Sequence, residues 1–143
     1  FPLLFLLQES RCVEKAAFLG FRTKQATVLE EAFEKACDKL VIATDDGSYG
    51  INGLVTSPFM AWLEEEKPDR VYTCGPEPMM KSVARVCIEK GIFCEVSMEQ
   101  RMGCGIGACL VCACRVSDGD DYQYAHVCKD GPVFPAERVL ENR

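Results

Sequence analysis

The sequence is short of three features that would each mark a class of protein. Basic residues are outnumbered, with 16 Lys and Arg against 22 Asp and Glu, and the formal net charge is -6. Without a basic stripe nothing would displace the counterions of a phosphate backbone, so we expect no nucleic-acid partner. Long apolar runs are also missing, because the longest, Pro2 to Leu7, falls well below the roughly 20 residues of a membrane-spanning helix. That run has no basic leader and no small-residue cleavage site, so we expect neither a signal peptide nor a membrane.

Cysteine, by contrast, is abundant. Ten cysteines in 143 residues would suggest a disulfide framework in a small secreted protein. Five of them, however, are scattered through segments with the pattern of buried helix or strand, and the other five crowd between Cys104 and Cys128. This split favours a reducing cytoplasm, in which the scattered thiols are small core residues and the crowded ones are ligands.

Up to about Val96 the sequence alternates short apolar runs with amphipathic stretches, which predicts an α/β fold with helices flanking a parallel sheet. A loop rich in turn residues is predicted over 45–53. Glycine and proline mark several of the element ends. We predict strands over 16–20, 40–44, 70–74 and 92–96, and helices over 2–12, 25–37, 55–66 and 76–90.

The alternation stops after Glu99, where a cysteine- and glycine-rich segment begins. A chain of 143 residues suits one ordinary domain with a small appendage. We therefore place a boundary within 97–101 and predict two domains, residues 1–98 and residues 99–143.

The cysteine-rich segment has the spacing of an iron-sulfur site. Cys104, Cys109 and Cys112 form a Cys-x4-Cys-x2-Cys pattern, and Cys128 follows. This is the ligand spacing of plant-type ferredoxins, so the four cysteines predict a 2Fe-2S cluster. The glycines between them allow backbone amides to turn toward the cluster sulfurs.

Other readings of these residues stay open. Zinc also accepts four thiolates, but zinc knuckles usually pair two Cys-x2-Cys arms and this chain has one. A Rieske centre is excluded, because it needs two histidines and His126 is the only one. We expect His126 at the surface or an interface. Cys114 is left out of the ligand set, because we expect an extended chain after Cys112 to turn it to a different face.

The motifs resemble a known family. Met98 to Cys112, followed by the run His-Val-Cys-Lys-Asp-Gly-Pro-Val-Phe at 126–134, closely resembles the electron transfer subunit of class B dihydroorotate dehydrogenase. The run at 72–80, which contains Cys-Gly-Pro, resembles the nicotinamide-binding domain of ferredoxin reductase-like proteins, and the run at 43–53 resembles a loop of that domain. The resemblance covers nearly the whole chain.

The resemblance implies an oxidoreductase subunit without catalytic residues of its own. In this family NADH reduces FAD, FAD passes single electrons to the 2Fe-2S cluster, and the cluster exchanges them with FMN in a partner dihydroorotate dehydrogenase of pyrimidine biosynthesis. Phe1 is read as an internal cut point beyond the FAD-binding barrel and the first strand of the nucleotide domain. We therefore expect FAD to bind only to the full-length subunit and this fragment to be inactive. Loss of the central strand should leave two half-sheets with unpaired edges. We expect residues 1–7, another chain, or a second copy of this chain to cover these edges.

Nucleotide contacts are implied at the end of a predicted strand, where doubly wound sheets bind ligands. Cys74, Gly75 and Pro76 lie there, and the resemblance puts Cys74 near the nicotinamide ring of NAD and Met79 near its edge. Three further residues are weaker candidates for ribose or phosphate contacts, because charged loop residues are usually only solvated. These are Arg22, Asp45 and Asp46.

Two other functions compete with this one. A related reductase subunit that serves another acceptor, such as a ferredoxin or a hydrogenase, would share the fold. A zinc-bound interaction module without redox activity would share the four cysteines, but it would be colourless.

Overall fold

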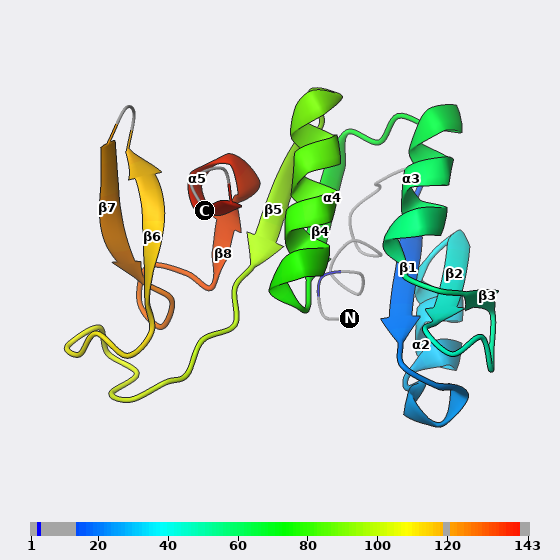
Figure 1. Cartoon of the computed structure of the whole chain (residues 1–143), viewed down its shortest axis with the longest axis horizontal. Coiled ribbons are helices and arrows are strands. Elements are labelled where there is room, and N and C mark those ends of the chain that lie inside the picture. The colour runs from blue at the N-terminus through cyan, green and yellow to red at the C-terminus, as the bar shows by residue number, and fades with distance from the viewer. Residues whose placement is uncertain (1–2, 4–13, 119–120, 141–143) are drawn as a thin grey trace. The chain divides into compact units, whose positions relative to one another are not determined.

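The computed structural model describes residue 3 and residues 14–118 and 121–140, so the predicted helix over 2–12 and the suggested role of residues 1–7 lie outside the described residues. The chain forms two compact units, Phe1–Glu64 and Glu65–Arg143 (Figure 1). No helix among the described residues is both long and apolar enough to cross a membrane.

The first unit is built on a small parallel sheet. Strands β1 (Ala16–Phe21), β2 (Lys39–Thr44) and β3 (Ile51–Asn52) lie in the order β1-β2-β3, and Ala16 of β1 lies opposite Lys39 of β2. The predicted strands 16–20 and 40–44 are confirmed, whereas β3 falls inside the predicted loop over 45–53. Both loops that follow β1 and β2 therefore leave the same edge of the sheet.

Helix α3 (Thr56–Glu65) covers β1 through aromatic side chains. The Phe18 ring lies 5.4 Å from the Phe59 ring and 5.3 Å from the Trp62 ring, measured between centroids. The absence of a side chain at Gly20 allows this approach, because a Cβ there would meet Val55 at 2.9 Å. Aromatic pairs of this kind hold a helix against a strand more firmly than buried area alone.

The predicted helix over 25–37 is wrong in its first half. Residues Lys24–Ala26 form one 3-10 turn, η1, and the α-helix α2 spans only Glu30–Ala36. Between them Thr27 is extended and its hydroxyl donates to the Lys24 carbonyl at 2.7 Å, while Leu29 has a left-handed backbone with φ of 59°. A threonine hydroxyl that bonds to the nearby backbone competes with helical hydrogen bonds, so the helix starts one turn later.

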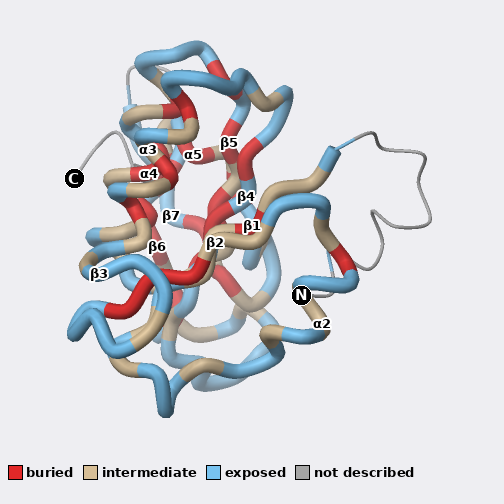
Figure 2. The backbone as a smooth tube through the Cα atoms, turned by 90° about the vertical axis from the view of Figure 1, so that its right-hand side faces the viewer, coloured by how far each residue is buried: buried red, intermediate tan, exposed pale blue. Residues whose placement is uncertain are grey.

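The second unit contains a mixed sheet in the order β4-β5-β8. Strands β4 (Arg70–Cys74) and β5 (Phe93–Ser97) are parallel and joined by α4 (Glu77–Glu89), close to the predicted bounds of all three elements. Val96 of β5 and Cys87 of α4 are both fully buried. Figure 2 shows buried stretches along α4, β4 and β5. The coarse expectation of an α/β fold with parallel sheets is thus confirmed.

The end of the chain returns to this sheet. Strand β8 (Val133–Pro135) pairs antiparallel with β5, and α5 (Ala136–Leu140) follows it at once. Between β5 and β8 lies a hairpin of β6 (Ala113–Asp118) and β7 (Asp121–His126). The predicted division at residue 98 stays a prediction. Strand β8, which lies beyond residue 98, adds a third strand to the sheet of β4 and β5, which lies before it.

Each sheet ends at an edge among the described residues. Strand β1 has β2 as its one described neighbour, and β4 has β5. This arrangement agrees with the two half-sheets expected from the sequence. An open strand edge presents unpaired backbone groups that another strand can bind.

Thr44 anchors the loop after β2, and its replacement provides a test of the first unit. Its fully buried hydroxyl donates to the Tyr49 carbonyl at 2.7 Å and accepts from the Tyr49 amide at 3.0 Å. We predict that Thr44→Val lowers the free energy of unfolding by about 1–3 kcal/mol, because it leaves the amide and the carbonyl of half-buried Tyr49 without these partners. Urea unfolding followed by fluorescence of Trp62, the single tryptophan, measures this.

Thr27→Val is the matched control in the same unit. Its hydroxyl makes one surface hydrogen bond that water can replace, so the expected loss is within about 0.5 kcal/mol. Equal losses in the two variants would show that the buried contacts of Thr44 do not anchor the loop.

Candidate functional site

The cysteine loop, residues 103–112, is an irregular segment between β5 and β6. Gly105 and Gly107 have positive φ angles of 70° and 77°, a conformation that side chains disfavour. These turns direct backbone amides at a sulfur: the amides of Ile106 and Ala108 donate to Cys104 Sγ at 3.5 and 3.2 Å. The amides turn inward beside the two glycines, and their predicted hydrogen bonds to the sulfurs of a cluster stay a prediction.

Amide donors change the acidity of Cys104. The Ile106 amide, followed by the amide and the thiol of Cys109, lowers the pKa of the Cys104 thiol to about 6. Hydrogen bonds to the ionised form stabilise that form, which is the cause of the shift. A thiolate is the form of cysteine that binds metals, so this loop prepares Cys104 as a ligand.

The four predicted ligands form two pairs of neighbouring thiols. Cys104 contacts Cys109, and Cys112 contacts Cys128. The contact with Cys112 raises the pKa of Cys128, which the Gly107 amide partly opposes by donating to the Cys128 sulfur. The charge of Cys104 also acts on Cys128, so the two pairs lie within electrostatic reach of each other.

The donor set suits a thiophilic metal centre, because it consists of four thiols surrounded by inward amides. Within residues 14–118 and 121–140, no three His, Cys, Asp or Glu side chains converge as a metal-binding group in their present positions. The thiols instead donate to one another in pairs. The set of four ligands therefore stays a prediction, supported by chemistry and proximity.

The reason given for excluding Cys114 is wrong. Residues two apart in a strand share a face, and Cys114 and Val116 of β6 are both buried on the same side of the hairpin, at 1% and 2% exposure. Cys112 lies in the turn before the strand and is also buried. The position of Cys114 inside the β6–β7 ladder, opposite Ala125, is what separates it from the loop.

His126 is half-buried at the end of β7, where its amide donates to Asp130 Oδ2 at 2.7 Å. The His126 Nδ1 atom lies 3.7 Å from the same oxygen. This carboxylate closes the turn that carries Cys128, so His126 has a structural role there.

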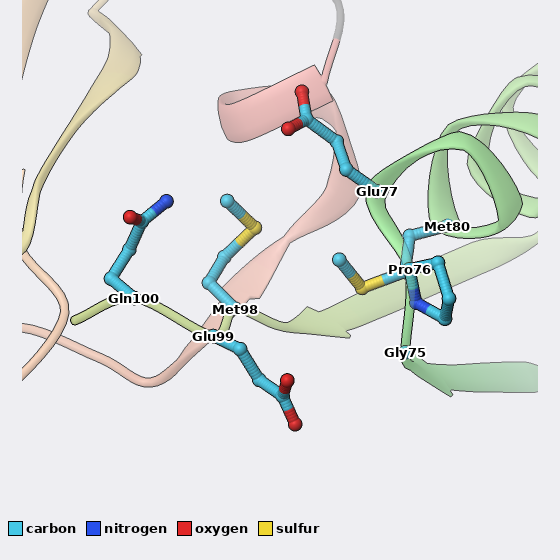
Figure 3. A pocket seen from close by; sticks show the side chains of 7 residues that line it. All are labelled: Gly75, Pro76, Glu77, Met80, Met98, Glu99 and Gln100. Carbon is cyan, nitrogen blue, oxygen red and sulfur yellow. The ribbon is translucent and has the colours of Figure 1, made fainter.

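A cleft of about 280 Å³ opens at the carboxyl ends of the parallel strands β4 and β5 (Figure 3). Buried Met80 and Met98 form its apolar floor, and in Figure 3 the Met80 thioether points toward Met98. Of the predicted nucleotide residues, Gly75 and Pro76 line the cleft, while Cys74 and Met79 do not. Met79 lies over Gly75 instead, where a Cβ would meet its methyl group at 2.9 Å.

Sequence reasoning missed five residues that line this cleft. The available signal was position: each follows the carboxyl end of a predicted parallel strand or begins the next helix, where open α/β sheets bind ligands. They are Glu77, Met80, Met98, Glu99 and Gln100.

The other predicted contacts lie in the first unit, at the edge where β1 and β2 end. The Asp46 amide donates to the Arg22 carbonyl at 3.3 Å and the Asp45 amide to the Phe21 carbonyl at 3.0 Å, so the two loops are neighbours. The Asp46 carboxylate accepts from the Ser48 hydroxyl at 2.6 Å and from its amide at 2.9 Å, and these bonds lower its pKa. Asp46 thus shapes the loop, and the proposed ribose or phosphate contacts stay predictions.

The chain is similar in sequence to known proteins. The model of the iron-sulfur cluster binding domain of dihydroorotate dehydrogenase B matches residues 99–140. The chain is 43% identical, over 97% of its length and 54% of the relative's, to the dihydroorotate dehydrogenase B (NAD(+)) electron transfer subunit of Caldanaerobacter subterraneus. It is 41% identical, over 96% of its length and 52% of the relative's, to the probable subunit of Methanocaldococcus jannaschii.

A solved structure gives the same picture of the fold. An NADH-dependent reduced ferredoxin-NADP oxidoreductase, studied for flavin-based electron bifurcation, superposes with a TM-score of 0.81 at 32% identity, over 97% of this chain and 48% of that one. The chain spans about half the length of the relatives that it matches.

The low pKa of Cys104 generates a test on metal-free protein. We predict that iodoacetamide at pH 7 alkylates Cys104 several-fold faster than Cys74, which is also exposed, and that the Cys104 rate falls as the pH drops through about 6, because only the thiolate reacts. Mass spectrometry of peptides measures both rates. A Cys104 rate that stays constant from pH 7 to pH 5 would contradict the lowered pKa.

Proposed function

Because the chain belongs to the family of dihydroorotate dehydrogenase B electron transfer subunits, we propose that it holds a 2Fe-2S cluster on Cys104, Cys109, Cys112 and Cys128. The cluster, when bound, supplies one-electron transfer. The observation that carries the proposal is the arrangement of these thiols as two contacting pairs, with inward amides at Cys104 and Cys128. All four cysteines lie inside the segment 99–140 that matches the cluster-binding family.

The chain's own residues would hold and shield the centre. The amides of Ile106, Ala108 and Gly107 would donate to ligand sulfurs, which raises the potential of a negatively charged centre. The Val127 amide donates to the Cys112 carbonyl at 3.1 Å, so the turn with Cys128 stays beside the loop. These contacts keep the cysteine loop and the turn of Cys128 side by side, so a metal centre would need only a local movement of the thiols to join the two pairs.

The cleft at the ends of β4 and β5 is proposed as the nicotinamide site. Its apolar floor of Met80 and Met98 suits a flat ring, and the carboxylates of Glu77 and Glu99 can accept hydrogen bonds from an amide or from ribose hydroxyls. Phosphates would be repelled by these carboxylates and would bind elsewhere. Gly75 and Pro76 line this cleft, and Cys74 and Met79 are proposed beside it, near the ring. As a separate proposal for the first unit, Arg22, Asp45 and Asp46 would contact ribose or phosphate.

For the whole protein we propose an electron route between NADH and a partner. FAD, bound by parts of the subunit beyond this chain, would exchange electrons with the cluster, and an FMN-containing dihydroorotate dehydrogenase would be the partner in pyrimidine biosynthesis. Relatives of that name reach 43% identity, against 32% for the ferredoxin-NADP oxidoreductase, so this acceptor is favoured over a ferredoxin or a hydrogenase.

We also propose a domain division, a self-association and a cellular location. The domains are proposed as a ferredoxin reductase-like NAD-binding domain over 1–98 and a cluster domain over 99–143, with the segment inactive by itself and able to self-associate through the open edges of β1 and β4. No disulfide joins any of the nine described cysteines, which supports a reducing cytoplasm as its location.

The cluster proposal is tested by metal content. We predict that protein prepared anaerobically is red-brown, holds two irons and two sulfides per chain, and loses its colour on addition of dithionite. Iron and sulfide analysis with visible absorption measures this. Zinc without iron after anaerobic reconstitution would reject the proposal in favour of a zinc module.

Two neighbouring cysteines supply a matched pair of variants for the same measurement. Cys112→Ser should abolish cluster assembly, whereas Cys114→Ser should retain it, because Cys114 lies within the β6–β7 ladder. Both thiols are equally buried, so general destabilisation would affect the two alike. Equal loss of iron would overturn the ligand assignment.

The choice of acceptor is tested on the full-length subunit. We predict that it copurifies with an FMN-containing dehydrogenase and that dihydroorotate then reduces NAD, because only a complete chain of flavin, cluster and flavin connects the two substrates. NADH formation at 340 nm measures the reaction. Reduction of a ferredoxin by NADH, with no reaction of dihydroorotate, would favour the alternative acceptor.

A further inference from the structure

Lys129 lies where the cysteine loop meets the turn that carries Cys128. Its side chain crosses Gly107: the Lys129 Cδ, Cβ and Cγ atoms lie 2.7, 3.2 and 3.5 Å from the position that a Cβ on Gly107 would occupy. Three methylene-chain atoms therefore pack on the backbone of the cysteine loop, in space that a side chain at residue 107 would fill. Gly107 is also the residue whose amide donates to the Cys128 sulfur.

The backbone of Lys129 is held in a closed turn. Its amide donates to the His126 carbonyl at 3.0 Å, and the Asp130 amide donates to the same oxygen at 2.7 Å. The Asp130 carboxylate binds the His126 amide from the other side at 2.7 Å. Because the turn is fixed at both ends, the direction in which Lys129 leaves the chain is fixed too.

Lys129 also carries a positive charge. Within residues 14–118 and 121–140, no carboxylate forms a salt bridge with its ammonium group, although the whole chain carries a formal net charge of -6. Four thiolates and two bridging sulfides around two ferric irons leave a net negative charge, and reduction makes that charge more negative by one. A positive charge over the loop favours the reduced form more than the oxidised one.

We propose that Lys129 is a positioning and tuning residue for the cluster, an inference that rests on the proposed 2Fe-2S function. Its methylene chain clamps the cysteine loop against the turn of Cys128, and this contact keeps the Gly107 amide on the Cys128 sulfur. Its ammonium group raises the reduction potential of the centre. The two roles belong to different parts of one side chain, so substitutions can separate them.

The experiment uses anaerobically loaded protein and four variants. Lys129→Met keeps the methylene chain and removes the charge, Lys129→Ala removes both, and Lys129→Arg keeps both. Lys67→Met is the matched control, because Lys67 is an exposed lysine of the same unit on the loop before β4. Midpoint potentials come from dye-mediated redox titration, and the rate of iron loss to a chelator reports the clamp.

We expect Lys129→Met to have a more negative midpoint potential than the unaltered protein, with Lys129→Arg and Lys67→Met unchanged. We expect Lys129→Ala to lose iron to the chelator several-fold faster than Lys129→Met. Equal potentials for Lys129→Met and Lys67→Met would overturn the tuning role, and equal rates for the Ala and Met variants would overturn the clamp. Absence of iron from the unaltered protein would instead reject the proposed function itself.

Discussion

The rest of the site depends on the contact between the cysteine loop and the turn at 126–130. The β6–β7 hairpin creates it, because the ladder begins with Ala113 opposite His126. Continued by one residue, this register brings Cys112 beside Val127, whose amide donates to the Cys112 carbonyl. Cys128 follows and meets the Cys112 thiol. A slip of one residue would turn every side chain of the hairpin to the other face and separate the two thiols.

A second constraint closes the segment at its base. Ser97 pairs with Val133, and the Met98 amide donates to the Pro132 carbonyl at 2.9 Å. The chain from 98 to 132 thus leaves the sheet and returns to it at one point. The cleft lined by Gly75, Met98 and Gln100 lies at this base. The segment with the proposed cluster ligands and the proposed nicotinamide cleft are therefore both attached to the sheet β4-β5-β8.

Prediction from sequence succeeded where a single local pattern decided the structure. β4 and α4 are bounded by Gly75 and Gly91 and have clear apolar periodicity, and both appear nearly as predicted. Prediction failed where local interactions compete with helical hydrogen bonds. The hydroxyl bond of Thr27 and the left-handed backbone of Leu29 delay the start of α2. Prediction also missed the residues of the cleft, because their neighbourhood arises from the parallel pairing of β4 with β5 rather than from any spacing along the chain.

The sequence by itself determined the chemistry of the site: the number of thiols, their spacing, and the glycines that let amides turn inward. Those properties are covalent and local, so a pattern of residues is enough to reveal them. Only the tertiary structure decided that β8 completes the sheet of β5, that Cys114 stays within the hairpin, and that Lys129 crosses Gly107. These contacts join residues far apart in the chain. Strand register and loop closure determine these contacts, and the spacing of residues along the chain predicts neither of them.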